Sequence, residues 1–422
     1  MISLTENKHA RIYFLISALL IIYFGEVVYK NIFNHEQLSG FGYTEFMINF
    51  EGGFVRRGLV GELLFQFCSA TGFSPLSTIY CICIAAWVSI VTFFLFKFKK
   101  NRWNWWLLMS PLFLGATFNV IRKDYLCYVI LISIFYLLSK QYKHNNIINS
   151  FGVMFLICLG LLLHEAFIFW GIPIVLLLIL KQKSTRIAGI LISIITISLF
   201  LVLCKYRGNT DIADSIYNSW NSILQDGELT KTDNNSIGAL GWDTTEAMKA
   251  HLKHNFTSAE FGKLTIIPRT LVAILVYYMF TNFLSVFMKQ EDENAIRIKR
   301  RISILYVISF FCLLPMFTIL SCDYGRLYQY ILVTTFSALI LLPGDRIDEA
   351  LPVRITNQIV KFNRYLNRIL VPTKGIMIML LLIVNVTPFQ FSISETIGYN
   401  IFSTLCNFPY FFTNLINALP IH

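Results

Sequence analysis

The stretch "PLSTIYCICIAAWVSIVTFFLFKFKKNR", residues 75–102, joins an uncharged apolar run to a basic cluster. Residues 75–96 are long enough to cross the roughly 30 Å hydrocarbon core of a bilayer as one helix. The run then meets Lys97, Lys99, Lys100 and Arg102, and such a basic flank is typical of the cytoplasmic end of a span. The stretch therefore predicts a transmembrane helix with its carboxyl end in the cytoplasm.

The whole chain has the composition of a polytopic membrane protein. Of its 422 residues, 56% are hydrophobic and 14% are charged, whereas soluble domains average about 25% charged residues. The apolar run Ile12–Val28 is followed by no small-residue cleavage site, so it is expected to be a retained span and not a signal peptide. The predicted fold is all-α, with 1–422 forming a single integral membrane domain.

Apolar runs of span length recur throughout and predict about eleven transmembrane helices. The expected spans are 11–29, 75–96, 104–121, 125–139, 147–164, 166–180, 187–204, 264–288, 302–320, 328–343 and 375–392.

Basic residues gather at alternate junctions between these spans, which orients the chain. Lys8 and Arg11 lie at the amino-terminal end of the first span, and five later junctions are basic in the same register. The positive-inside rule places the amino terminus and these junctions in the cytoplasm. It places the first loop, 30–74, the large loop, 205–263, and the C-terminal tail, 393–422, outside.

The cytoplasmic segment 344–374 mixes apolar and basic residues, with Ile355, Phe362 and Tyr365 among arginines and lysines. This pattern predicts an interfacial amphipathic helix against anionic lipid. A simple topology anchor without a further role is the plainer interpretation.

Cysteine and histidine patterns predict neither a disulfide framework nor a metal site. Most of the nine cysteines lie inside apolar runs, where a thiol behaves as a small hydrophobe. His251 and His254 have ligand spacing, but no third ligand is evident, so a solvated helix face is expected. No cofactor is expected.

The external stretch "FEGGFVRRGLVGELL", residues 50–64, places Arg56 and Arg57 where topology anchoring does not explain them. Its glycines allow close approach of backbone to a ligand, and paired guanidinium groups bind phosphate oxygens. No Lys-Ser/Thr follows the last glycine, so it is no Walker loop. Two interpretations stay open: a diphosphate cradle, or a re-entry turn whose arginines pair with Glu51 and Glu62.

Two further polar clusters fall at predicted outer helix ends. Arg122, Lys123 and Asp124 form one, in which the cations are candidates for the anion site and Asp124 for orienting them. His164 and Glu165 form the other, between two apolar runs. Because partial burial raises the pKa of a carboxylate, Glu165 is a candidate general base or acid, with His164 beside it. The plainer alternative for residues 122–124 is a capped turn with an internal ion pair. For His164 and Glu165 it is a buried pair that only satisfies backbone or a neighbouring arginine.

The remaining candidates lie near the later spans. Asp323, Tyr324 and Arg326 combine an acid, a sugar-stacking aromatic ring and a phosphate-binding cation. Arg269 lies just inside a span, where an arginine is a functional candidate. Trp242, in the large loop, suits a lid or polymer-binding surface. An interfacial belt of tyrosine and arginine remains the alternative for residues 323–326.

This layout, with "FVRRG", "RKD", "HE" and "DYGR" at outer helix ends, resembles the bacterial O-antigen and capsule repeat-unit polymerases of the Wzy type. The resemblance covers the whole chain as a layout and includes no strict motif. It implies polymerisation of undecaprenyl-diphosphate-linked repeats at the periplasmic face of the inner membrane. Arg56, Arg57, Arg122 and Arg326 would then bind the diphosphate. The implied partners are lipid-linked donor and acceptor glycans and the bilayer. A chain-length regulator is a further candidate partner, and nucleic acid is none.

Other classes compete with this interpretation. The chain also resembles the wider group of multi-spanning lipid-sugar glycosyltransferases, whose first external loop carries a catalytic acid, and Glu45 or Glu51 would match it. A lipid-linked oligosaccharide transporter would need charges spread through its mid-span regions, and these are almost free of charge here. A membrane O-acyltransferase using His164 is the weakest alternative.

Overall fold

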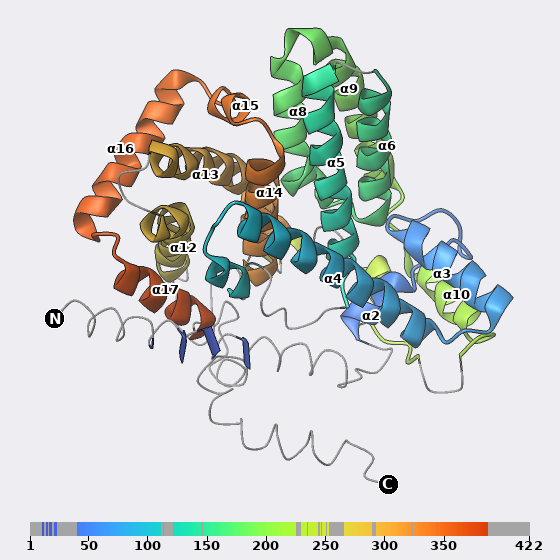
Figure 1. Ribbon diagram of the computed structural model, residues 1–422. Helices are drawn as coiled ribbons and strands as arrows, with labels where there is room; N and C mark the ends of the chain where they lie inside the picture. The colour runs from blue at the N-terminus through green and yellow to red at the C-terminus, as the bar shows by residue number, and fades with distance from the viewer. Residues whose placement is uncertain are drawn as a thin grey trace.

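The computed structural model is an all-α assembly of helices (Figure 1). It describes parts of residues 11–22, then 40–110, 113, 121–144, 147–224, 229–252 apart from 234, 244, 246 and 250, 266–288, 293–321 and 324–386. These ranges contain no β-strand, and four of their helices are long and apolar enough to cross a membrane. The all-α membrane class is therefore confirmed, while the count of eleven spans stays a prediction.

Most predicted spans in the described ranges are helices. α4 covers Pro75–Lys100, starts with proline at its first position and ends in the basic cluster. Proline there sacrifices no hydrogen bond, because the first amides of a helix have no partner within it. The corresponding helices elsewhere are α5 (Asp124–His144), α6 (Ile147–Leu163), α9 (Arg186–Lys205), α12 (Ile266–Phe287), α14 (Tyr324–Leu341) and α17 (Lys374–Val386).

Three predicted spans differ from the helices observed. The expected helix 166–180 divides at Gly171 into α7 (Phe167–Trp170) and α8 (Ile172–Lys181), with Pro173 in the first turn of α8. α13 runs from Glu293 to Cys312, so it starts earlier than 302, and the π-turn η4 (Met316–Leu320) follows Pro315. Since proline removes an amide donor and clashes with the preceding turn, both breaks have a local cause.

The third difference is at 104–121, whose start is not an α-helix. The short 3₁₀ helix η1 covers Trp105–Met109, and Ser110 is extended. Pro111 follows, and proline disfavours helical backbone at the preceding residue. Most of the remainder of this segment, the first predicted span and the tail 393–422 lie outside the described residues.

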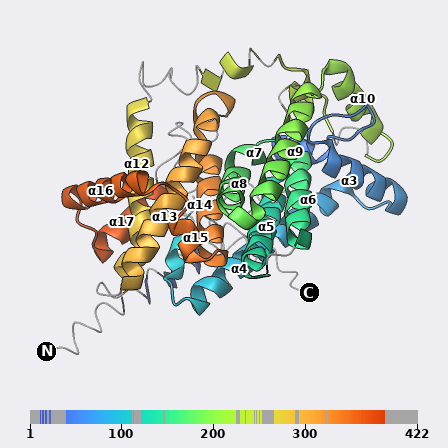
Figure 2. The same cartoon turned by 90° about the horizontal axis from the view of Figure 1, so that it is seen from above.

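Two predicted external segments interlock at one end of the molecule (Figure 2). The first loop contains α2 (Phe41–Phe46) and α3 (Gly58–Thr71), and the large loop contains α10 (Thr210–Trp220) and η3 (Gly238–Gly241). The indole Nε1 of the fully buried Trp220 donates to the Met47 carbonyl at 2.7 Å, and Asn49 Nδ2 donates to Ser219 Oγ at 2.8 Å. These hydrogen bonds between the large loop and the first loop stabilise the position of residues 45–57.

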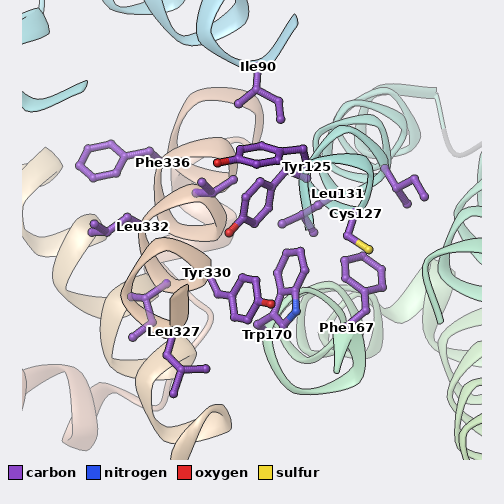
Figure 3. Close-up of a cluster of buried hydrophobic side chains, with 14 of the residues drawn as sticks. Ile90, Tyr125, Cys127, Leu131, Phe167, Trp170, Leu327, Tyr330, Leu332 and Phe336 are labelled. Atoms are coloured by element: carbon purple, nitrogen blue, oxygen red, sulfur yellow. The ribbon is translucent and has the colours of Figure 1, made fainter. Parts of the chain in front are cut away.

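An aromatic core joins α5, α7 and α14 (Figure 3). Trp170 and Tyr330 stack with ring centroids 4.6 Å apart and planes 2° apart, and Tyr128 meets both edge-on. Such contacts add about 0.5–1.5 kcal/mol per pair beyond area burial. Because Tyr330 is one helical turn from Arg326, this core also sets the position of the Arg326 guanidinium.

α15 (Gly344–Asp348) and α16 (Val353–Ile369) complete the described fold. α16 lies at the edge of the molecule in both views, beside α12 and α13 (Figures 1 and 2). Asp348 pairs with Arg300 and Arg301 of α13 at 2.8 Å each.

Candidate functional site

Five segments bring their charged side chains into one cluster. α2 supplies Glu45, the turn before α3 supplies Arg56 and Arg57, and the start of α5 supplies Lys123 and Asp124. The junction between α6 and α7 supplies His164 and Glu165, and the first turn of α14 supplies Arg326. Four of these segments are the polar clusters noted in the sequence, and they lie together although Arg56 and Arg326 are 270 positions apart.

Glu165 binds both arginines of the first loop. Arg57 Nε donates to Glu165 Oε2 at 2.7 Å, while its Nη2 bonds Oε1 at 2.5 Å, so the pair is bidentate. Arg56 Nη1 lies 3.2 Å from the same Oε1 atom. The side chain of Arg56 is 33% exposed and that of Glu165 only 11%, so Arg56 lies at the rim of the cluster.

Glu45 and His164 form the inner wall. Glu45 Oε1 lies 3.4 Å from His164 Nε2 and 3.6 Å from Arg57 Nη1. The Ala166 amide donates to His164 Nδ1 at 3.1 Å, which assigns the proton of a neutral imidazole to Nε2. Glu45 Oε1 is buried and accepts no hydrogen bond from the described residues, so the neutral ring lies beside this carboxylate without bonding to it.

A second bidentate pair links α5 to α14. Arg326 Nε donates to Asp124 Oδ2 and its Nη2 donates to Oδ1 at 2.9 Å. The Tyr330 hydroxyl donates to the same Oδ1 atom at 2.6 Å, and Arg326 Nη2 lies 3.2 Å from His164 Nε2. His164 therefore lies between the two ion pairs, but with its proton on Nε2 the ring cannot accept a hydrogen bond from Arg326.

Lys123 holds the backbone of the arginine turn. Its side chain is fully buried, and Nζ donates to the Arg57 carbonyl at 2.7 Å. Arg57 is the N-cap of α3 and has a left-handed backbone with φ of 64°. A side chain is strained there, by roughly 1–2 kcal/mol for a residue with a Cβ atom. The buried ammonium stabilises this conformation and does not reach the surface, in contrast to the diphosphate-binding role predicted for it.

Charge interactions set the protonation of the cluster. Burial alone would raise the pKa of Glu165, but Arg57 and Arg56 outweigh burial and hold that pKa well below its usual range. The raised pKa predicted from burial is therefore wrong for this arrangement. Burial also opposes ionisation of Glu45, yet the surrounding cations lower its pKa too. Burial lowers the pKa of Lys123 to about 8.

The cluster as a whole carries one excess positive charge, which the buried Lys123 supplies. Four cations (Arg56, Arg57, Lys123 and Arg326) face three carboxylates (Glu45, Asp124 and Glu165). The sharing of one Glu165 carboxylate between two guanidinium groups leaves donor capacity for an anion. Such a site can bind an anionic group next to a carboxylate whose basicity depends on the same arginines.

The second interpretation of residues 50–64 was a turn whose arginines pair with Glu51 and Glu62, and the contacts of these two acids bear on it. Glu62 accepts a hydrogen bond from the Phe50 amide at 2.9 Å, and Glu51 is exposed. In the described structure the arginines pair instead with Glu165 and Glu45. Glu51, predicted as a catalytic acid, therefore lies outside the cluster.

The other predicted residues are placed less fully. Arg122 is half-buried beside Lys123, and Trp242 is exposed, with its Nε1 donating to the Asp233 carbonyl at 3.1 Å. The side chains of Arg269 and Tyr324, at the starts of α12 and α14, and all of Asp323 lie outside the described residues.

Tyr330 was not among the residues predicted from the sequence, and Glu45 was predicted only as an alternative. Tyr330 follows Arg326 by four residues, so it shares a face of α14 with that arginine, and this spacing could have indicated it. Glu45 stands alone in a short apolar segment, and only its first-loop position indicated it.

The ranges that the structure describes contain no group of three or more histidine, cysteine, aspartate or glutamate side chains placed to hold a metal ion.

Comparisons with known proteins add no relatives: no family model matches the chain, and neither a curated protein nor a solved structure matches it.

Proposed function

We propose that the cluster transfers a sugar from a polyprenyl-diphosphate-linked donor to the hydroxyl group of an acceptor glycan. The observation that carries the proposal is the sharing of Glu165 by two arginines at the rim of a cluster in a membrane protein. A lipid-borne diphosphate can meet that rim while its tail stays in the bilayer.

The arginines have a double task in this mechanism. Arg56 and Arg57 bind the diphosphate oxygens, and Arg326 adds positive charge behind them. As the bond between the anomeric carbon and the diphosphate oxygen breaks, negative charge develops on the leaving group. Fixed cations stabilise that charge more in the transition state than in the donor.

Donor binding also activates the base. In the free protein Arg57 and Arg56 lower the pKa of Glu165, which makes it a weak base. A diphosphate that draws these guanidinium groups away removes that stabilisation, so the carboxylate becomes more basic when the donor is bound. The acceptor oxygen then bonds to the anomeric carbon, its proton passes to Glu165, and the lipid diphosphate leaves with the electron pair of the broken bond. His164, which contacts Glu45, and Asp124, which holds Arg326, orient these groups.

The specific form proposed is polymerisation of undecaprenyl-diphosphate-linked repeat units at the periplasmic face of a bacterial inner membrane. It rests on the basic junctions, which direct the amino terminus to the cytoplasm and the arginine turn outward, and on the family resemblance of the layout. Tyr324, Asp323 and Trp242 are the candidates for sugar contact, and Arg122 and Arg269 for additional diphosphate contact.

A single-sugar transferase of the wider lipid-sugar group is the second candidate. The position of Glu45 favours it, because an acid of the first external segment is buried within the cluster, 3.4 Å from His164. A transporter is less favoured, because the clustered charges lie at helix ends and turns.

The decisive experiment supplies the purified full-length protein, reconstituted in nanodiscs, with undecaprenyl-diphosphate-linked repeat units and follows chain growth as a gel ladder. A ladder supports polymerisation, and single addition supports the second candidate. Without any glycosidic bond formation, transfer at this site is refuted.

Two variants test the roles separately. Glu165→Gln should lower the transfer rate by at least about 100-fold, the usual scale for a general base. It should also tighten binding of undecaprenyl diphosphate, because it frees Arg56 and Arg57. Arg57→Ala should lose both transfer and binding. Glu293→Gln and Arg297→Ala, in an exposed pair on α13, are the matched controls and should keep both. If Glu165→Gln binds the diphosphate more weakly than the parent, the shared-arginine mechanism is wrong.

A further inference from the structure

The outward face of α16 carries two parallel stripes of opposite character. Ile355, Phe362, Tyr365 and Ile369 form the apolar stripe, and each is exposed, Tyr365 by 61% and Ile369 by 66%. Arg354, Lys361, Arg364 and Arg368 form the basic stripe, and they are exposed as well.

The two stripes have identical spacing. Each cation directly precedes an apolar residue, so both stripes repeat at intervals of seven, three and four residues. At about 100° per residue, each stripe occupies a narrow arc of the helix, and the arcs lie side by side. Residues 353–374 contain five basic residues and no acid. A helix whose outward face is in water would not place four large apolar side chains on that face beside a basic stripe.

A third face fixes α16 to the bundle. Asn363 is buried, its Oδ1 accepts from the Tyr277 hydroxyl at 2.6 Å, and its Nδ2 donates to Ser303 Oγ at 2.8 Å. The Tyr278 hydroxyl donates to the Leu370 carbonyl at the end of the helix. Because these contacts set its rotation about its own axis, the protein itself directs the basic stripe and most of the apolar stripe away from the bundle. Phe362 lies at the inner edge of the apolar stripe, where its ring also contacts Tyr277 with centroids 5.8 Å apart.

The attachment point lies at a transition from polar to apolar sequence. Ser303 comes two residues after the run Lys299, Arg300 and Arg301, and from Ile302 to Cys312 α13 carries no charge. Charged side chains stay at the headgroup level while apolar helix enters the hydrocarbon. α16 is therefore held at the level expected for a membrane surface.

We propose that α16 lies in the surface of the bilayer, with its apolar stripe among acyl chains and its basic stripe on the phosphates of anionic lipids. A helix in the membrane surface needs an apolar stripe and a basic stripe side by side along its whole length. The bilayer therefore explains the one-residue offset between the stripes more directly than a partner protein does. The inference is independent of the proposed glycosyl transfer.

Tryptophan probes on α16 test the depth of each stripe. Tyr365→Trp places an indole in the apolar stripe, and Asn357→Trp places one on the basic side of the same helix. In vesicles of phosphatidylcholine and phosphatidylglycerol with bromine on the acyl chains, the fluorescence added by Tyr365→Trp should be quenched more than that added by Asn357→Trp. Aqueous iodide should give the reverse order.

Lipid selectivity tests the basic stripe. For the Tyr365→Trp protein, brominated phosphatidylglycerol should compete against unbrominated phosphatidylcholine with a preference of at least about fivefold, the factor that one cation contributes at an anionic surface. Replacing all four stripe cations by glutamine should reduce the preference to about onefold. Should that variant fold poorly, added salt should reduce the preference of the Tyr365→Trp protein itself, since surface charge is screened.

Three results would overturn the proposal. Equal iodide quenching of both probes means that the apolar stripe faces water. Protection of Tyr365→Trp from both bromolipid and iodide means that a protein, such as a second copy of this chain, covers it. A selectivity that neither salt nor the glutamine substitutions change excludes the basic stripe as the lipid-binding element.

Discussion

We expect the ion pair between Asp124 and Arg326 to contribute strongly to the stability of the folded protein. Asp124 is almost fully buried, and both oxygens of its carboxylate accept from Arg326, with the Tyr330 hydroxyl as a third donor. Removing one member of a buried pair leaves an uncompensated charge and costs about 3–5 kcal/mol. Asp124→Asn should therefore destabilise the protein by about that amount, as should Arg326→Gln.

The assay is thermal unfolding in detergent, followed by circular dichroism. For a chain of this size about 2 °C of melting temperature corresponds to 1 kcal/mol, so each single variant should melt about 6–10 °C lower than the parent. The double variant should lose much less than the two single losses together, because it leaves no charge unpaired. Tyr330→Phe removes one hydrogen bond to a charged acceptor and should cost about 1.5–3 kcal/mol.

The exposed pair Glu293–Arg297 provides the matched control. Its side chains are 79% and 51% exposed, and such pairs contribute about 0–1 kcal/mol. Glu293→Gln should thus leave the melting temperature almost unchanged. The reasoning is refuted if Asp124→Asn melts within about 2 °C of the parent, or if the losses of the two single variants simply add.

Two further predictions concern Gly61 in the first loop and Lys123 at the start of α5. A Cβ atom at Gly61 would lie 1.8 Å from the Ile48 carbonyl oxygen. Gly61→Ala should therefore separate α3 from the preceding turn and lower the yield of folded protein, measured by size-exclusion chromatography. A yield equal to that of the parent would contradict this close approach. Lys123 has a pKa of about 8 in the folded protein, against an ordinary value of 10.5. Between these two pH values the unfolded chain binds more protons than the folded protein does. The free energy of unfolding of the parent should therefore increase as the pH rises. In Lys123→Met that gain, measured as melting temperature against pH, should be absent; an identical pH profile would exclude Lys123 as its source.

The sequence is most informative where one segment suffices to determine the structure. The uncharged run 75–96 and its basic end predict α4 correctly because span length and flanking charge are local properties. The break at Gly171 was missed, since the apolar run continues through it and only Gly171 and Pro173 indicate a change. Hydropathy measures the environment of a segment and is insensitive to a single interruption of its hydrogen-bond ladder.

The site shows a different limit. The positions of Arg57, Glu165 and Arg326 at predicted outer helix ends led us to assign them to one site, and in the structure they lie in one cluster. Sequence position could not give the partner of each, and the direction of the Glu165 pKa depends on those partners. Burial and charge act in opposite directions on a carboxylate, so the sign follows from a distance of about 3 Å to Arg57 and not from the apolar flanks.

The backbone of Arg57 connects these observations. A left-handed residue is normally glycine, and Gly58 is its immediate neighbour, yet Arg57 takes the strained position. Its carbonyl is directed to the buried Lys123, while its guanidinium is directed to Glu165 and Glu45. Strain that the surrounding structure maintains at the expense of stability is concentrated at functional sites. Arg102, in the turn after α4, is left-handed as well, so this backbone conformation alone does not mark a site. The buried Lys123 on the carbonyl of Arg57 and Glu165 on its guanidinium are the contacts that favour an anion site over a structural loop.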